Sequence, residues 1–168
     1  MSLGGTGPAA PTPCPASTAQ FGDQFHDGGC TIRADTTWAN GRFVLRGNLT
    51  VRSGIRLTLE NLTLLLDPAT EQQWRIYVDG GELVMRGGSL GSNTTRHWRL
   101  ETSATTQGRI DLTGANVSRA GANGGGPYSA FLLAGGNHHR FANLTVTDSA
   151  LNADWHHAVI SSWSEGIT

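Results

Sequence analysis

The stretch LENLTL, residues 59–64, returns three more times along the chain in altered form. Its third residue is always Asn or Gly, which adopt the left-handed backbone conformation more easily than other residues. An apolar residue stands two places before that position, and another follows within three places. Each copy therefore predicts a strand, a sharp bend and a second strand. The other copies follow at nearly regular spacing and are MRGGSL (85–90), LTGANV (112–117) and FANLTV (141–146).

A third strand is expected later in each unit, followed by a glycine turn. The glycines that begin successive units are also nearly evenly spaced: Gly29, Gly54, Gly81, Gly108, Gly136 and Gly166. A period of roughly 27 residues with short strands and no helical periodicity is typical of a β-solenoid, whereas a sandwich predicts no such period. The third strands are expected at WRIYV (74–78), WRLET (98–102), SAFLLA (129–134) and HAVISS (157–162).

The repeated runs resemble the right-handed parallel β-helix, or pectate-lyase-like, superfamily. They are GIRLTLENLTL (54–64), GELVMRGGSL (81–90), GRIDLTGANV (108–117) and HRFANLTVTDS (139–149). The resemblance implies an all-β, right-handed parallel β-helix with a short N-terminal cap and about five coils of roughly 25–30 residues each. Residues 36–61 also resemble the first coils of exported bacterial and archaeal surface proteins. The superfamily includes polysaccharide lyases, glycoside hydrolases, adhesins and phage tailspikes, so the likeness is specific for fold and not for chemistry.

Composition narrows the function classes. The chain has 168 residues, which suits one domain, and a net charge of −1, which argues against nucleic acid as a partner. All 12 basic residues are arginine, so lysine chemistry is excluded. There is no run of 18 apolar residues, and no membrane span is expected.

The N-terminal part divides into a flexible lead-in, residues 1–16, and a cap, residues 17–28. Ser17 and Thr18 suit a helix start, and Phe21 and Phe25 would share one helix face. The two cysteines, Cys14 and Cys30, predict a disulfide that ties the cap to the first coil; two unrelated buried thiols are the alternative. A disulfide implies an oxidising setting, hence a secreted or cell-surface location.

Residues 29–168 are expected to form the β-helix. The chain stops at EGIT (165–168), just after the next unit begins, which predicts a fragment of a longer solenoid. An open C-terminal coil would leave a sheet edge able to pair with another molecule, so end-to-end self-association is expected there.

Loops of variable length precede the third strand of each unit and are expected to stack on one flank, the usual binding surface of a solenoid. An aromatic residue lies near the same place in each: Trp74, Trp98, Tyr128 and Trp155. These rings could form a platform for sugar rings or an internal ladder that seals the coil. The glycan-binding candidates on this flank are Arg96, His97, Tyr128, Asp154, Trp155 and His156.

Catalytic residues are harder to assign. Asp148 and Asp154 share the longest polar loop, and Arg140 could act as the base of a lyase. The resemblance implies calcium as cofactor only for a lyase. No HxH, HExxH or CxxC spacing occurs, so no other metal site is expected.

Two functions compete on these residues. The first is a secreted or cell-surface module with a structural or glycan-binding role. The alternative is the N-terminal part of a polysaccharide lyase or glycoside hydrolase, and the sequence leaves open whether the chain is an enzyme. A flat polar flank favours the structural role, and a groove with converging carboxylates favours the enzyme.

Overall fold

The computed structural model describes residues 13–103, 105–106, 108–121, 131–132 and 139–147. Within these residues every regular element is a β-strand, which confirms the predicted all-β class. The strands are β1 (Gly22–Asp27), β2 (Cys30–Ile32), β3 (Thr36–Arg46), β4 (Leu49–Val51), β5 (Arg56–Leu66), β6 (Arg75–Val78), β7 (Glu82–Arg86), β8 (Ser89–Ser92), β9 (Arg99–Thr102), β10 (Arg109–Thr113), β11 (Asn116–Ser118), β12 (Phe131–Leu132), β13 (Arg140–Ala142) and β14 (Thr145–Thr147).

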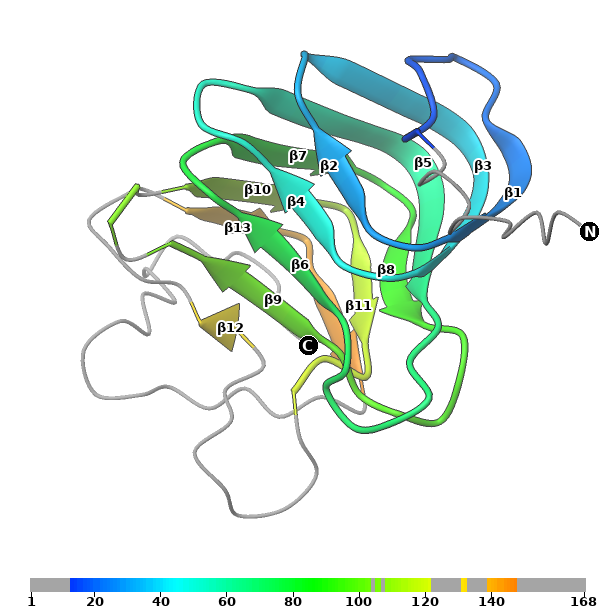
Figure 1. Cartoon of the computed structure of the whole chain (residues 1–168). Coiled ribbons are helices and arrows are strands. Elements are labelled where there is room, and N and C mark those ends of the chain that lie inside the picture. The colour runs from blue at the N-terminus through cyan, green and yellow to red at the C-terminus, as the bar shows by residue number, and fades with distance from the viewer. Residues whose placement is uncertain (1–12, 104, 107, 122–130, 133–138, 148–168) are drawn as a thin grey trace, which may run out of the picture.

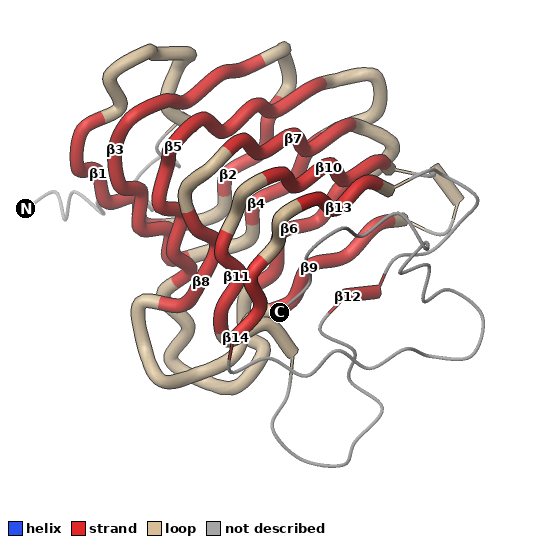
Figure 2. Tube along the Cα trace, turned by 180° about the vertical axis from the view of Figure 1, so that it is seen from behind, coloured by secondary structure: helices blue, strands red, loops and turns tan. Residues whose placement is uncertain are grey.

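The strands wind into a parallel β-solenoid. Each described strand pairs in parallel with the strand one coil away, and none of them pairs with its neighbour in the chain. A coil of three strands is clearest at β7, β8 and β9, where a bend separates the first two strands and a loop precedes the third. In β3 and β5 the first two strands run together as one element of 11 residues. Figure 1 shows the stacked coils, and Figure 2 shows the same stack from behind.

Two sheets result from this winding. The larger sheet has nine strands and contains both strands that flank each bend, while β2, β4, β6, β9 and β12 form a second sheet of five. The five strands of the smaller sheet span four complete turns. The expected fifth coil extends past residue 147, outside the described residues.

The predicted bends are confirmed. Asn61, Gly87, Gly114 and Asn143 all have positive φ, between 49° and 68°. Asn40, with φ 56°, lies next to Asn61 on the adjacent coil and is a fifth member of the same column. The sequence did not reveal it, because the first coil is shorter than the later ones and breaks the period.

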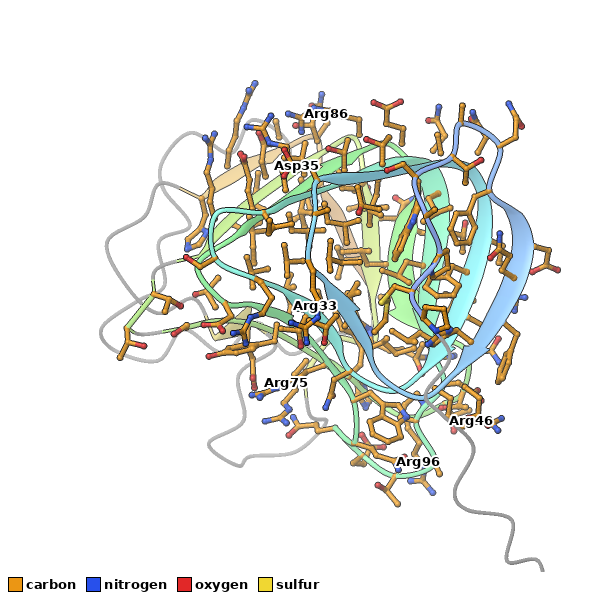
Figure 3. The ribbon with its side chains drawn as sticks, turned by 45° about the horizontal axis from the view of Figure 1, so that its top comes forward. Arg33, Asp35, Arg46, Arg75, Arg86 and Arg96 are labelled. Carbon is orange, nitrogen blue, oxygen red and sulfur yellow. A yellow bond between two sulfur atoms is a disulfide. The ribbon has the colours of Figure 1, made fainter. Side chains whose placement is uncertain are left out.

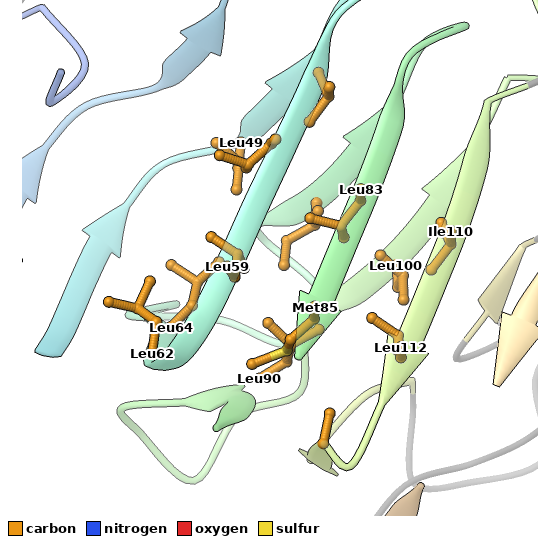
Figure 4. Packing of buried hydrophobic residues seen from close by; sticks show 14 of the residues in the cluster. Leu49, Leu59, Leu62, Leu64, Leu83, Met85, Leu90, Leu100, Ile110 and Leu112 are labelled. Atoms are coloured by element: carbon orange, nitrogen blue, oxygen red, sulfur yellow. The ribbon is translucent and has the colours of Figure 1, made fainter. Parts of the chain in front are cut away.

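Inward-facing side chains fill the centre of the stack. Register places Leu59, Met85 and Leu112 in successive coils, and all three are fully buried. Leu49 and Leu100 approach them from the opposite sheet, as Figure 4 shows. Because burial of each large apolar side chain contributes about 1.5–3 kcal/mol, these columns dominate the stability of the stack.

The N-terminal end differs from the expected helical cap. Residues 22–27 form β1, which pairs with β3, so the helix prediction is wrong. Phe21 is buried and Phe25 is exposed, although a helix would place both on one face. Gly22 has φ 73°, a left-handed turn that ends any helical run at its start.

Aromatic rings close the core at this end. Phe21, Trp38 and Phe43 pack with ring centroids 5.2–5.3 Å apart. The predicted disulfide between Cys14 and Cys30 is present, and it holds the segment before Phe21 against the first coil. The indole N–H of Trp38 donates to the Pro15 carbonyl at 3.2 Å, which adds a second tie.

Candidate binding flank

The loops after β5 and β8 stack on one side of the solenoid, as the sequence predicted. Their backbones are joined: the N–H of Gln72 donates to the His97 carbonyl at 2.8 Å, and that of Asn93 donates to Leu66 at 2.7 Å. The Thr94 hydroxyl donates to the Pro68 carbonyl at 3.0 Å. The two loops therefore follow the same repeat as the strands.

Asp67 is the centre of the polar contacts at the start of this flank. The Asn93 amide donates to one carboxylate oxygen at 3.0 Å, and Arg46 donates to the other at 2.9 Å. The hydrogen bond from Asn93 lowers the pKa of Asp67, and Arg46 lowers it further against the opposing effect of burial. Arg42 donates to Asn93 at 2.9 Å, so these polar contacts run across several coils.

A second group of polar contacts, around Glu71, contains two of the predicted glycan-binding residues, Arg96 and His97. Arg96 approaches Glu71 at 3.6 Å, and both the backbone N–H and the ring of His97 lie within 3.0 Å of the same carboxylate. Burial raises the pKa of Glu71, but the hydrogen bonds with His97 and with Arg96 bring it below its ordinary value. His97 is buried while Arg96 is exposed, so only Arg96 of this pair presents its charged group to solvent.

The aromatic residues of the described loops point inward. Trp98 is fully buried, and its indole N–H donates to the Ser118 carbonyl at 2.8 Å. Trp74 is half-buried, packs against the core and donates to the Asp67 carbonyl at 3.3 Å. Of the two arrangements expected for the aromatic rings, a sugar-stacking platform or an internal ladder, Trp74 and Trp98 follow the internal one. Tyr128 and Trp155 lie outside the described residues.

Arg140, the candidate lyase base, lies elsewhere. It is the first residue of β13 and pairs in register with Asp111 on β10. Arg86 lies on the same sheet and binds Asp111 through two hydrogen bonds of 2.9 Å. Arg86 and Arg96 appear at opposite edges of the molecule in Figure 3. The described structure therefore does not bring Arg140 to the flank.

The described neighbour of Arg140 is the buried carboxylate of Asp111. Burial raises the pKa of the Asp111 carboxyl, but hydrogen bonds and charge from Arg86, followed by the charge of Arg140, lower it below its ordinary value. A base must accept a proton, whereas here the positive charge of Arg140 stabilises a buried carboxylate. The other catalytic candidates, Asp148 and Asp154, and the binding candidate His156 lie outside the described residues.

His139 was not among the candidate site residues. Its Nδ1 accepts a hydrogen bond of 3.1 Å from the backbone N–H of Ile110, so the ring is neutral in this arrangement. Burial lowers the pKa of His139, and the nearby charge of Arg109 lowers it further. The imidazole of His139 therefore accepts a hydrogen bond from the backbone of β10, as a backbone carbonyl of a neighbouring strand would.

The described residues offer no group of three or more His, Cys, Asp or Glu that could hold a metal ion. Calcium takes about six to eight oxygen ligands, mostly carboxylates and carbonyls. On the described flank, Asp67 and Glu71 each face arginine instead, so these residues do not fit calcium.

Comparison with protein-family models, with curated proteins and with solved structures found no match to this chain. Among the described residues, no helix is long and apolar enough to cross a membrane.

Proposed function

We propose that this chain is a rigid structural module of a secreted or cell-surface protein, built as a right-handed β-helix of the pectate-lyase-like type. The observation that carries the proposal is the pairing of carboxylates with arginines from adjacent coils. Eight different Asp and Glu residues of the described part lie within 4.0 Å of an arginine, including Asp67 and Glu71 in the described loops of the flank.

Such pairs suit a spacer better than a catalyst. Glu82, for example, lies between Arg56 of the coil before and Arg109 of the coil after, at 2.6 and 3.5 Å. A glycosidase needs two carboxylates free to act as acid, base or nucleophile. Carboxylates neutralised by neighbouring coils instead stabilise the stack against sliding and bending.

Two further observations support this function. The disulfide between Cys14 and Cys30 suits an exported protein, because disulfides persist in oxidising compartments. The inward orientation of Trp98 and the half-burial of Trp74 remove two rings from a sugar-stacking platform. In its described part, the loops after β5 and β8, the flank presents the charged group of Arg96 to solvent, whereas Trp98 is buried and Trp74 is half-buried.

The test is a binding and cleavage screen of the whole chain against acidic and neutral polysaccharides, with and without calcium. Unsaturated products are followed by ultraviolet absorbance and reducing ends in parallel, with a known polysaccharide lyase as the positive control. A structural module gives no product and no retention. Product in either channel would overturn the proposal in favour of the lyase or hydrolase. Retention without product would favour a glycan-binding role. Arg96→Gln would then locate the contact, with Arg33→Gln, an exposed arginine directly after β2, as its matched control.

A further inference from the structure

Among the described residues, no strand pairs with the outer edge of β1 at the N-terminal end of the solenoid. Within the described residues β1 pairs only with β3, whereas β3 pairs on both sides. Every second residue of β1 lies on its outer face, and these residues are Asp23, Phe25 and Asp27. In register they lie opposite Arg42, Val44 and Arg46 of β3. The edge thus presents backbone hydrogen-bonding groups beside an acidic, apolar, acidic row.

All three side chains are exposed, which is ordinary for the two aspartates and unusual for Phe25. The side chains of Asp23 and Asp27 are each 73% exposed, although one arginine lies near each of them. Asp67 and Glu82, which lie deeper in the stack between two coils, are 13% and 19% exposed. Phe25 is 55% exposed and is the single large hydrophobic residue so exposed in the described part of the chain.

The stack shows which charge would fit beyond this edge. Arg46 lies between Asp27 of the coil before and Asp67 of the coil after. Glu82 lies between Arg56 and Arg109 in the same manner. Because the sign of charge alternates from coil to coil, a strand added outside β1 would carry basic residues opposite Asp23 and Asp27 and an apolar residue opposite Phe25.

We propose that the open edge of β1 binds an extended strand of another protein, in which two basic residues four positions apart flank an apolar residue. The pattern is the one that β3 presents to the other side of β1, Arg42-Phe43-Val44-Leu45-Arg46. Backbone hydrogen bonds would supply affinity, and the charged row would supply selectivity, as in other cases of strand addition.

The segments of this chain outside the described residues do not have the proposed sequence pattern. All 12 basic residues are arginines, and every one lies in the described residues, so the remaining segments contain no Arg or Lys. A second copy is a poor partner, because two-fold pairing of β1 with itself centred on Phe25 would place Asp23 opposite Asp27 of the copy. Like charges directly opposite each other destabilise a strand pair.

The test measures binding of a fluorescent peptide, acetylated and amidated, with the sequence GRFVLRG of residues 41–47, to the full chain. The expected result is saturable binding that is absent for the control peptide GEFVLEG. Asp23→Asn/Asp27→Asn should weaken binding about tenfold, since two charge pairs are lost. Asp35→Asn/Glu60→Gln removes two exposed charges away from this edge and should leave binding unchanged.

Phe25→Pro tests the backbone when it is compared with Phe25→Ala, which also lacks the ring but keeps the N–H. The N–H of Gly28 donates to the Arg46 carbonyl at 2.9 Å, so strand alternation directs the N–H of Phe25 away from β3. Proline there removes the outward donor while leaving the ladder to β3 intact, and binding should be lost. The proposal is overturned if GRFVLRG does not bind, if both double variants bind it equally, or if Phe25→Pro binds it as well as Phe25→Ala does.

Discussion

The bends depend on single residues with positive φ and on neighbours that allow the coils to approach closely. Gly88, with φ 81°, follows the bend at Gly87, and a Cβ placed on it would lie 2.2 Å from the Leu62 carbonyl oxygen. Gly114, with φ 62°, occupies the bend one coil later, and its nearest atom would be 3.9 Å away. Both positions disfavour side chains, but only Gly88 lacks space as well.

Alanine substitution separates these two effects. Gly114→Ala should cost about 1–2 kcal/mol from the left-handed backbone alone. Gly88→Ala should cost a further 1–3 kcal/mol or so, because backbone of the neighbouring coil must move. Chemical denaturation of both variants measures the difference, and equal losses of stability would contradict the close approach of the coils at Gly88.

His139 predicts a pH dependence. Its pKa in the folded chain lies below the ordinary value of 6.5, so the unfolded chain binds the proton more tightly. Its contribution to stability is complete above pH 6.5 and is lost as the pH falls through the folded pKa. Asp67, Glu71 and Asp111 also have lowered pKa values. Their contribution to stability is lost only at more acidic pH, below the ordinary carboxyl pKa values of 3.8 and 4.5.

The check is the free energy of unfolding between pH 7.5 and 5 for the wild type and His139→Leu. The variant should be less stable at pH 7.5, because the Ile110 N–H loses its acceptor, and its stability should decline less as the pH falls. Parallel pH profiles for the two proteins would rule out the assigned role of His139.

At the scale of elements, the N-terminal strands depend on the disulfide and the aromatic cluster. Cys14 and Cys30 are 16 positions apart and join the segment before β1 to β2. Loop-closure entropy assigns a bond across such a loop about 3 kcal/mol. Cys14→Ser/Cys30→Ala should lower stability by about that amount and reduce hydrogen-exchange protection first in β1 and β2. Uniform loss of protection through β7 and β10 would argue against this local role.

The outer face of the larger sheet predicts a contrast between two paired carboxylates. Asp111 is buried and receives two hydrogen bonds from Arg86, whereas Asp27 is exposed and lies 4.0 Å from Arg46. Asp111→Asn should cost about 1.5–3 kcal/mol, because a charged hydrogen bond is lost in a buried setting. Asp27→Asn should cost less than about 0.5 kcal/mol. Denaturation midpoints at matched salt decide whether the two differ.

Elements also show where sequence reasoning succeeds and fails. The bend column could be predicted because Asn61, Gly87, Gly114 and Asn143 share a backbone requirement that few residues meet. The strand β1 could not, because spacing of Phe21 and Phe25 by four suits a helix as well. Pairing with β3 and the left-handed turn at Gly22 override that local pattern.

At the scale of the whole molecule, contacts between coils decide the function of each polar residue. The sequence placed Arg96 and His97 on the flank but missed Glu71, which comes from the preceding coil. The repeat offered a signal, since Glu71 and His97 are separated by one period and therefore share a register. Burial of His97 could not be predicted, because it depends on how the two loops stack.

The central claim is that successive coils stack in parallel register, and one crosslinking measurement tests it most directly. The Ser89 hydroxyl donates to that of Thr63 across neighbouring coils at 3.2 Å. Thr63→Cys/Ser89→Cys should therefore form a disulfide under mild oxidation, beside the native bond between Cys14 and Cys30. Thr63→Cys/Asn116→Cys, with the two cysteines two coils and about 9.6 Å apart, should not. Crosslinking of the distant pair as readily as the near pair, or of neither, would contradict the solenoid.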